Sequence, residues 1–252
     1  MLTHLEARLR TSTYDDRTGN GLLVRGRPLV QRLGAALNTS FVTIDNAVAA
    51  GVDLLLVHHP SWPSIDLHLH PPKLDRLHAT QLSLYAAHEA LDRAPTDSVG
   101  ALLARRIDLT LEREGGDDLV IGIAPSLTFE VWTALVADRL GTPIRAWPNN
   151  PHFRRVAVVP GGGGSTDYVA RAIGLGCDTF LTGEGSLYTE LFARECGVSL
   201  VLASHSATEL SAVCALAAST AHELVLDWVP IEGDTHITGG GRAPIEHSPR
   251  AG

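Results

Sequence analysis

The sequence predicts an α/β protein with two similar lobes, each built on a mainly parallel or mixed sheet flanked by helices. Segments with helical patterning and capping residues alternate with short leucine-rich or β-branched runs, as in chains made of βα units. A phrase of helix, glycine, strand and polar residue also recurs along the chain. The 252 residues are enough for two lobes with a substantial core.

The recurring phrase keeps one spacing. The stretch "TIDNAVAAGVDLLLVHH" reads as a helix, a glycine, a strand buried on both faces and then a histidine, and "YVARAIGLGCDTFLTGE" and "ELFARECGVSLVLASH" repeat it. Each glycine fits the left-handed position that ends a helix. Because ligands bind at the carboxyl ends of parallel strands, the polar residues are candidate ligands or acid/base groups. The glycine and the polar residue are eight positions apart each time: Gly51 and His59, Gly176 and Glu184, Gly197 and His205.

These elements predict where the lobes divide. We expect the first lobe to span residues 1–125 and to include the run "LSLYAAHEALD", which ends at His88 and Asp92 without the glycine. We expect the second lobe to span 126–232, from the helical "TFEVWTALVADRL" to a last strand in "ELVLDWVPI". Residues 233–252 have no periodicity and many glycines and prolines, which predicts a flexible tail.

Composition and charge exclude several classes of protein. A net charge of −8 disfavours nucleic acids and anionic membranes as direct partners. The three cysteines form no CxxC pair, which indicates small core residues in a reducing compartment. The N-terminal segment is too polar for a signal peptide, and no apolar stretch reaches the ~18 residues of a membrane span. We therefore expect a cytoplasmic protein.

Three imidazoles and two carboxylates are expected at one edge of the sheets. A histidine pair that ends a strand, or a histidine and a glutamate at i and i+4 at a helix start, can each be purely structural. Together they suit Zn, Fe, Mn or Ni, and their carboxylates can bridge two ions. The candidate metal ligands are His58, His59, Asp92, His205 and Glu209.

The glycine run in "RRVAVVPGGGGSTDYVARAIG" is a second candidate. It lacks the spacing of a dinucleotide loop and the lysine of a Walker loop. It can offer backbone amides at a helix start to a phosphate or carboxylate, or serve only as a tight turn. The candidate anchors are Gly162, Gly163, Gly164 and Ser165. The other histidine motif, His68 and His70 in "SIDLHLHPP", is expected to be a solvated loop.

The blocks "VDLLLVHHPSW", "LYAAHEALD", "VAVVPGGGGS", "GCDTFLTGE" and "LASHSATE", in this order, resemble the type 2 GTP cyclohydrolase I homologue family. The resemblance covers the chain from Gly19 to Pro230. It implies two lobes with a dinuclear metal site in the cleft between them, assembled as a homo-hexameric ring. It carries the same five ligands over by position and places Glu184 beside the metals as a catalytic acid/base.

The chain also departs from the family pattern. Where many members carry a histidine pair after TGE, this sequence has Ser186, Leu187 and Tyr188, which puts in doubt any histidine-assisted step there. The extra domain of longer relatives is absent between the lobes.

Three functions remain open at this point. A hydrolase of a nucleotide-like or phosphorylated small molecule would use two metal ions, Glu184 to move protons and the glycine run to hold an anionic group. A metal-handling or regulatory binding protein would carry the same ligands without turnover. A transcription-linked adaptor is disfavoured as a direct DNA binder by the acidic charge.

Overall fold

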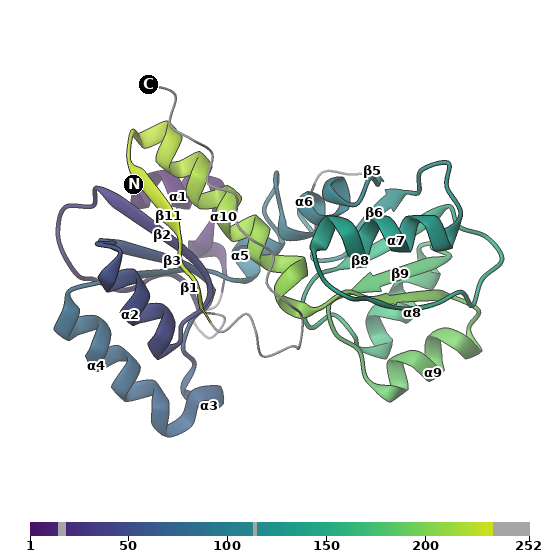
Figure 1. The fold of residues 1–252 in the computed structure, drawn as a ribbon, viewed down its shortest axis with the longest axis horizontal. Helices are drawn as coiled ribbons and strands as arrows, with labels where there is room; N and C mark the ends of the chain where they lie inside the picture. Colours follow the sequence, from purple (N-terminus) through teal and green to yellow (C-terminus); the bar gives the residue numbers. More distant parts are fainter. Residues whose placement is uncertain (15–18, 113–114, 234–252) are drawn as a thin grey trace.

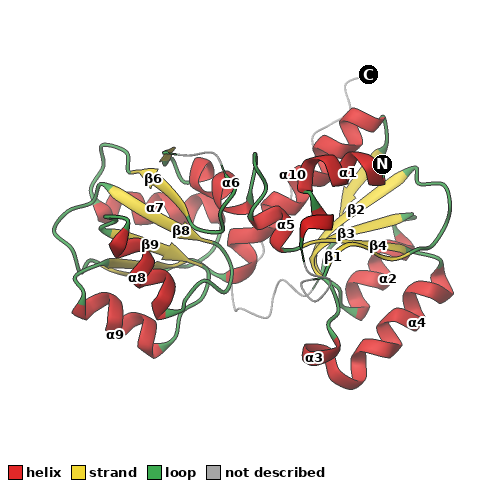
Figure 2. Cartoon of the chain, turned by 180° about the vertical axis from the view of Figure 1, so that it is seen from behind, coloured by secondary structure: helices red, strands yellow, loops and turns green. Residues whose placement is uncertain are grey.

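The structure is a computed structural model that describes residues 1–14, 19–112 and 115–233. It confirms the two-lobed α/β fold, with one sheet in each lobe and helices on both faces of each sheet (Figures 1 and 2). Among the described residues, no helix combines the length and apolar character that crossing a membrane requires.

The sheet of the first lobe has five strands in the order β1-β4-β3-β2-β11. The four strands from β4 to β11 run parallel, and β1 is antiparallel to β4 at the edge. Their bounds are β1 Asn20–Val24, β2 Arg32–Asn38, β3 Leu54–His59, β4 Ser83–Ala87 and β11 Asp227–Pro230. Helices α2 (Phe41–Ala49) and α4 (His70–Thr80) bury apolar residues against one face, and α1 (Leu2–Leu9) and α10 (His205–Leu224) against the other.

The sheet of the second lobe has six strands in the order β5-β6-β8-β9-β10-β7. Its central strands β8, β9 and β10 are parallel, and the other pairings are antiparallel. Their bounds are β5 Thr110–Leu111, β6 Val120–Ile123, β7 Arg145–Trp147, β8 Arg155–Val159, β9 Thr179–Thr182 and β10 Ser199–Leu202. Helices α6 (Val99–Arg106) and α7 (Phe129–Leu140) cover one face, and α8 (Thr166–Gly174) and α9 (Leu187–Glu195) the other.

The sequence predicted that the first lobe ends at residue 125, but the two sheets do not divide the chain there. Strands β5 and β6 lie before that position but pair within the second sheet. After β10 the chain returns to the first lobe, where α10 packs on the sheet and β11 pairs with β2. The chain therefore builds the first sheet from segments that lie before and after the segments of the second sheet. The tail predicted over 233–252 lies outside the described residues from 234 onward.

The recurring glycines end helices as predicted. Gly51, Gly176 and Gly197 follow α2, α8 and α9, with φ of 68°, 76° and 66°. A left-handed residue there closes the helix and turns the chain into the next parallel strand. The polar residue of each phrase consequently stands at or just past the end of β3, β9 or β10.

The segment with His68 and His70 is helical, and not the loop expected from its prolines. It forms α3 (Pro63–Asp66), the 3-10 turn η3 (Leu67–Leu69) and the start of α4. Proline is tolerated in the first turn of a helix because the amide it lacks has no partner there, and both α3 and α4 carry proline at this position. His70 Nδ1 lies 2.9 Å from Ser61 Oγ, and His68 is exposed.

Candidate metal centre

The five predicted ligands meet where the two lobes face each other. His58 and His59 end β3, and Asp92 ends the short helix α5 (Glu89–Asp92). His205 and Glu209 lie in the first turns of α10, which begins just after β10. The i, i+4 spacing brings His205 Nε2 to 3.1 Å from Glu209 Oε2.

Each of the three imidazoles has its Nδ1 next to an oxygen. His58 Nδ1 is 3.0 Å from the carbonyl oxygen of Ala87, and His59 Nδ1 is 2.7 Å from Asn38 Oδ1. These oxygens only accept, so each Nδ1 carries the proton and donates it. His205 Nδ1 likewise lies 3.3 Å from Glu184 Oε1. On His58 and His59 this leaves the Nε2 lone pairs toward the centre, as in histidines that bind metals.

Glu209 is the shared partner of these Nε2 atoms. Its side chain is only 6% exposed, and its oxygens lie 3.7 Å from His58 Nε2 and 3.3 Å from His59 Nε2. Burial alone would raise the pKa of Glu209, but His205 and the other two imidazoles lower it below its usual value. The carboxylate is therefore ionised at neutral pH. Asp92 Oδ1 joins from the side, 3.6 Å from His58 Nε2.

The protonation of the other groups follows from burial and from these charges. Burial, helped by the neighbouring His58, lowers the pKa of His59 to about 3, so this ring is neutral. Burial also raises the pKa of Asp92 to about 6. Burial would lower the pKa of His205, but the carboxylates of Glu209 and Glu184 raise it to about 9.

Two observations test whether these residues fit metal ions. The buried atoms Glu209 Oε2 and His205 Nε2 lie 3.1 Å apart but form no well-aligned hydrogen bond with each other or with any other described residue, although buried polar atoms are normally satisfied. Gly161, with φ of 60°, also leaves open the space beside them, since a Cβ there would lie 1.8 Å from Glu209 Oε1 and 2.9 Å from His205 Nε2. A mixed nitrogen and oxygen donor set around such a space fits Zn, Fe, Mn or Ni.

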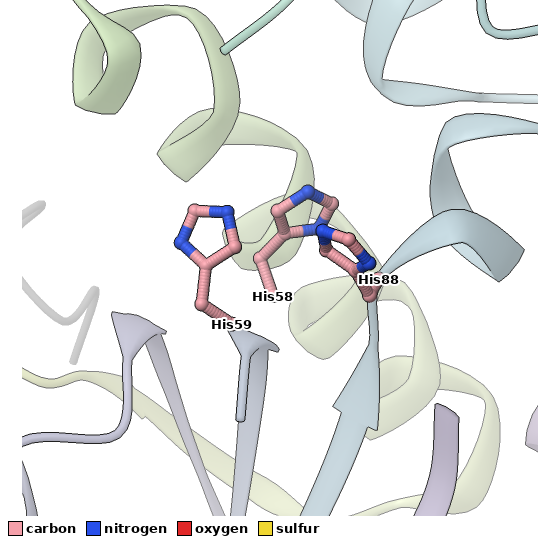
Figure 3. Close-up of side chains that lie close together, drawn as sticks. All are labelled: His58, His59 and His88. Atoms are coloured by element: carbon pink, nitrogen blue, oxygen red, sulfur yellow. The ribbon is translucent and has the colours of Figure 1, made fainter. Parts of the chain in front are cut away.

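The donor atoms fall into two groups that share His59. His59, His205 and Glu209 place one donor atom each within 4.8 Å of one another, and so do His58, His59 and His88 (Figure 3). His88, directly after β4, was outside the predicted ligand set. Its position straight after a parallel strand was a usable signal, because His59 is placed in the same way. Asp92 belongs to neither group.

The predicted anchor loop divides into two parts. Gly162 and Gly163 line a cavity of about 300 Å³ together with His59, His205 and Glu209. Gly164 instead packs against the backbone of Glu184, and its Cβ position is 2.1 Å from that carbonyl oxygen. The Ser165 hydroxyl accepts a hydrogen bond from the Tyr168 amide and caps α8. Gly161 was not among the predicted residues, because four consecutive glycines look alike in a sequence.

Glu184 lies on the far side of His205. Its side chain is 58% exposed, and it lines a different cavity, of about 400 Å³, into which His205 also faces. Ser186, where the sequence departs from the pattern implied by the family resemblance, caps α9. Leu187 and Tyr188 after it are exposed. In the described part of the chain, Glu184 therefore reaches the candidate ligands through His205.

Parallel strands from two sheets that end on a shared cluster of histidines and carboxylates define a class of two-lobed α/β proteins with a candidate metal centre at the lobe boundary. The chain belongs to the Duf34/NIF3 (NGG1p interacting factor 3) family, whose sequence model matches residues 1–235. This confirms the family resemblance found in the sequence.

Proteins of similar sequence and solved structures of similar fold match this protein over most of its length. The protein named "GTP cyclohydrolase 1 type 2 homolog" from Deinococcus radiodurans is 34% identical, over 87% of both chains. The one from Halobacterium salinarum is 37% identical, over 84% of this chain and 88% of that protein. A solved structure titled as protein ybgI of unknown function matches with a TM-score of 0.82 at 27% identity, covering 92% of this chain and 97% of the other. TTHA1606 from Thermus thermophilus matches with a TM-score of 0.78 at 27% identity, covering 94% and 97%.

Proposed function

We propose that the protein is a metal-dependent hydrolase that holds two divalent ions at the lobe boundary and acts on a nucleotide-like or phosphorylated small molecule. The observation that carries this proposal is the convergence of the three Nε2 atoms on the buried carboxylate of Glu209. The ligands would be His58, His59, Asp92, His205 and Glu209, and the ions Zn, Fe, Mn or Ni. Bound there, they would act as Lewis acids toward the bond to be hydrolysed.

The protein's own residues would orient the site and hold the substrate. The oxygens of Ala87 and Asn38 fix two rings, and Glu184 holds the proton on His205 Nδ1. Because Glu184 is more than half exposed, it can exchange that proton with water, which supports its proposed acid/base role. Gly162 and Gly163 line the 300 Å³ cavity, and their backbone amides are proposed to hold an anionic group.

The same cavity favours turnover over metal storage. A closed and fully ligated site argues against catalysis, whereas an open space beside the ligands leaves room for a substrate. Here that space is lined by His59, His205 and Glu209 themselves. Metal handling without turnover is the outcome that a failed substrate screen would support.

Assembly and location remain proposals. We propose a cytoplasmic homo-hexamer, mainly on the family resemblance. The exposed apolar side chains of Ile65, Leu67 and Leu69 on α3 and η3 are surface that an assembly would cover. Light scattering that gives the mass of one 26.8 kDa chain at all concentrations would exclude the hexamer.

The experiment that tests the function is metal analysis of anaerobically purified protein, followed by a substrate screen with the metal found. The similar proteins named GTP cyclohydrolase 1 type 2 homolog make GTP the first substrate, followed by other nucleotides. We expect His59→Ala to lose metal and His68→Ala, its exposed control, to keep it. Loss of metal in His68→Ala alone would show that the cluster is wrongly chosen.

A further inference from the structure

The cavity beside the candidate metal ligands has a second part of its lining, around an arginine that pairs with a carboxylate. Besides His59, His205 and Glu209, it is lined by Arg93, Asp118 and Tyr168, and by the acidic residues Glu89 and Asp92. Among the described residues that line it, Arg93 is the only lysine or arginine. Arg93 directly follows the candidate ligand Asp92 at the end of α5, so one short segment serves both parts of the cavity.

Arg93 reaches across the lobe boundary. It donates a hydrogen bond from Nη2 to Asp118 Oδ2 at 3.1 Å, and Asp118 precedes β6 of the second sheet. Asp118 also accepts from the Tyr168 hydroxyl at 2.7 Å and from Arg171 Nη1 at 3.1 Å. Burial would raise the pKa of Asp118, but its side-chain interaction with Asp117, followed by the contacts with Tyr168 and the two arginines, holds it well below its usual value. The carboxylate therefore stays ionised and keeps two donors even when Arg93 turns to another partner.

The guanidinium has donors to spare. An arginine carries five N–H donors in a planar fork, and the Arg93 side chain is 43% exposed. That fork matches two oxygens of a phosphoryl group, which makes arginine a better phosphate partner than lysine. Gly162 and Gly163 line the same cavity, and their backbone amides could add uncharged donors to an anionic group next to Arg93.

We propose that Arg93 is the specificity-determining residue of this site and binds the phosphoryl group of a small molecule whose remainder lies next to the candidate metal ligands. The inference rests on the proposed function for its substrate class. It is nevertheless a statement about phosphate recognition that can be measured without turnover. Phosphorylated molecules then bind more tightly than their dephosphorylated forms because of this one side chain.

Arg171 provides a matched control. It also pairs with Asp118, and with Asp117, but it is not among the residues that line this cavity. Arg171→Gln thus removes one arginine from the network around Asp118 without touching the cavity. Arg93→Lys is the second comparison, because it keeps the charge and loses the fork.

The test is calorimetric titration of inorganic phosphate into wild type and the variants Arg93→Gln, Arg93→Lys and Arg171→Gln, each in metal-loaded and metal-free form. A charge-assisted hydrogen bond is typically worth enough to change affinity by about 10- to 100-fold. We expect that loss in Arg93→Gln in both metal states, an intermediate loss in Arg93→Lys, and affinity close to wild type in Arg171→Gln. Metal content and melting temperature, measured on each variant, separate loss of recognition from loss of the site.

Two results overturn the proposal. Equal phosphate affinity in Arg93→Gln and wild type shows that Arg93 does not bind the anion. An equal loss in Arg93→Gln and Arg171→Gln shows that the network around Asp118 matters only structurally. Failure of wild type to take up metal overturns the hydrolase, and the metal-free titration still decides the role of Arg93.

Discussion

Replacing Gly161 by alanine should remove metal binding without unfolding the protein. The added Cβ would lie 1.8 Å from Glu209 Oε1, and real Cβ atoms essentially never approach closer than 3.0 Å. The carboxylate must therefore move by about 1.2 Å, whereas metal–ligand distances tolerate only about 0.2 Å. Changing a residue that only supports a metal ligand already costs about 10- to 100-fold in affinity, and here a candidate ligand itself is displaced, so we expect at least that loss.

The strain of a left-handed alanine must be separated from this clash. Gly161 has φ of 60°, and a side chain in that conformation costs about 1–2 kcal/mol. Gly197 has nearly the same φ, 66°, with nothing within 4 Å of its Cβ position, so Gly197→Ala carries the strain alone. Gly162→Ala tests the loop without the clash, because its Cβ meets only His205 Cε1 at 3.8 Å.

The assay is competition for metal against a chelator of known affinity, with thermal unfolding of each metal-free variant. We expect Gly161→Ala to be destabilised at least as much as Gly197→Ala, because it adds the clash to the strain, and only Gly161→Ala to lose metal. If Gly161→Ala binds metal as wild type does, Glu209 is not a ligand in the position described. If Gly197→Ala loses metal equally, the effect is general destabilisation.

Three further predictions concern the charges of the site. Burial raises the pKa of Asp92 from its ordinary value of 3.8 to about 6, so its ionisation lowers the stability of the fold progressively as the pH rises between these two values. Asp92→Asn should therefore raise the melting temperature of metal-free protein near neutral pH and have little effect below about pH 4, as thermal scans will show. Because the pKa of His205 is about 9 without metal, a proton must leave before Nε2 can bind; metal affinity should rise about tenfold per pH unit from about pH 6 to 9, and a flat profile would contradict this assignment. Glu184→Gln should keep both metals, since its amide oxygen can still accept from His205 Nδ1, and lose about 10²–10⁴ of turnover; equal rates in this variant and wild type would count against the acid/base role.

The strand ends were predictable because their physical causes are local. An apolar run such as Leu54–Val57 must be buried on both faces, which is typical of a strand in a parallel sheet. In such a sheet the carboxyl ends of the strands carry the binding site, so the residues that follow the run are predicted to lie there. The i, i+4 spacing of His205 and Glu209 likewise fixes one helix face. Local rules were enough to assemble the five candidate ligands.

What was missed depends on neighbours that are distant in the sequence. Strands β5 and β6 are two and four residues long, too short for their pattern to choose a sheet; β6 joins the second sheet by pairing with β8, and β5 joins it by pairing with β6. Gly161 differs from the three glycines after it by its left-handed φ of 60° and by the Glu209 carboxylate next to its Cβ position, and neither is visible in a run of four glycines. Whether Glu184 lies next to a metal ion or next to His205 Nδ1 depends on the angle between β10 and α10, which the spacing of residues along the chain does not determine.

The path of α10 and β11 also has a consequence for how the protein is made. Helix α10 places His205 and Glu209 at the boundary and then runs over the first sheet, and β11 completes that sheet beside β2, with Trp228 opposite Leu33. Contacts between such distant parts of a chain form late, after most of it has left the ribosome. A nascent chain that already contains His58, His59 and Asp92 therefore lacks the remaining candidate ligands and an edge strand of the first sheet. The candidate metal centre is thus complete only when both sheets are in place, and the first lobe gains its last strand after the second sheet has been synthesised.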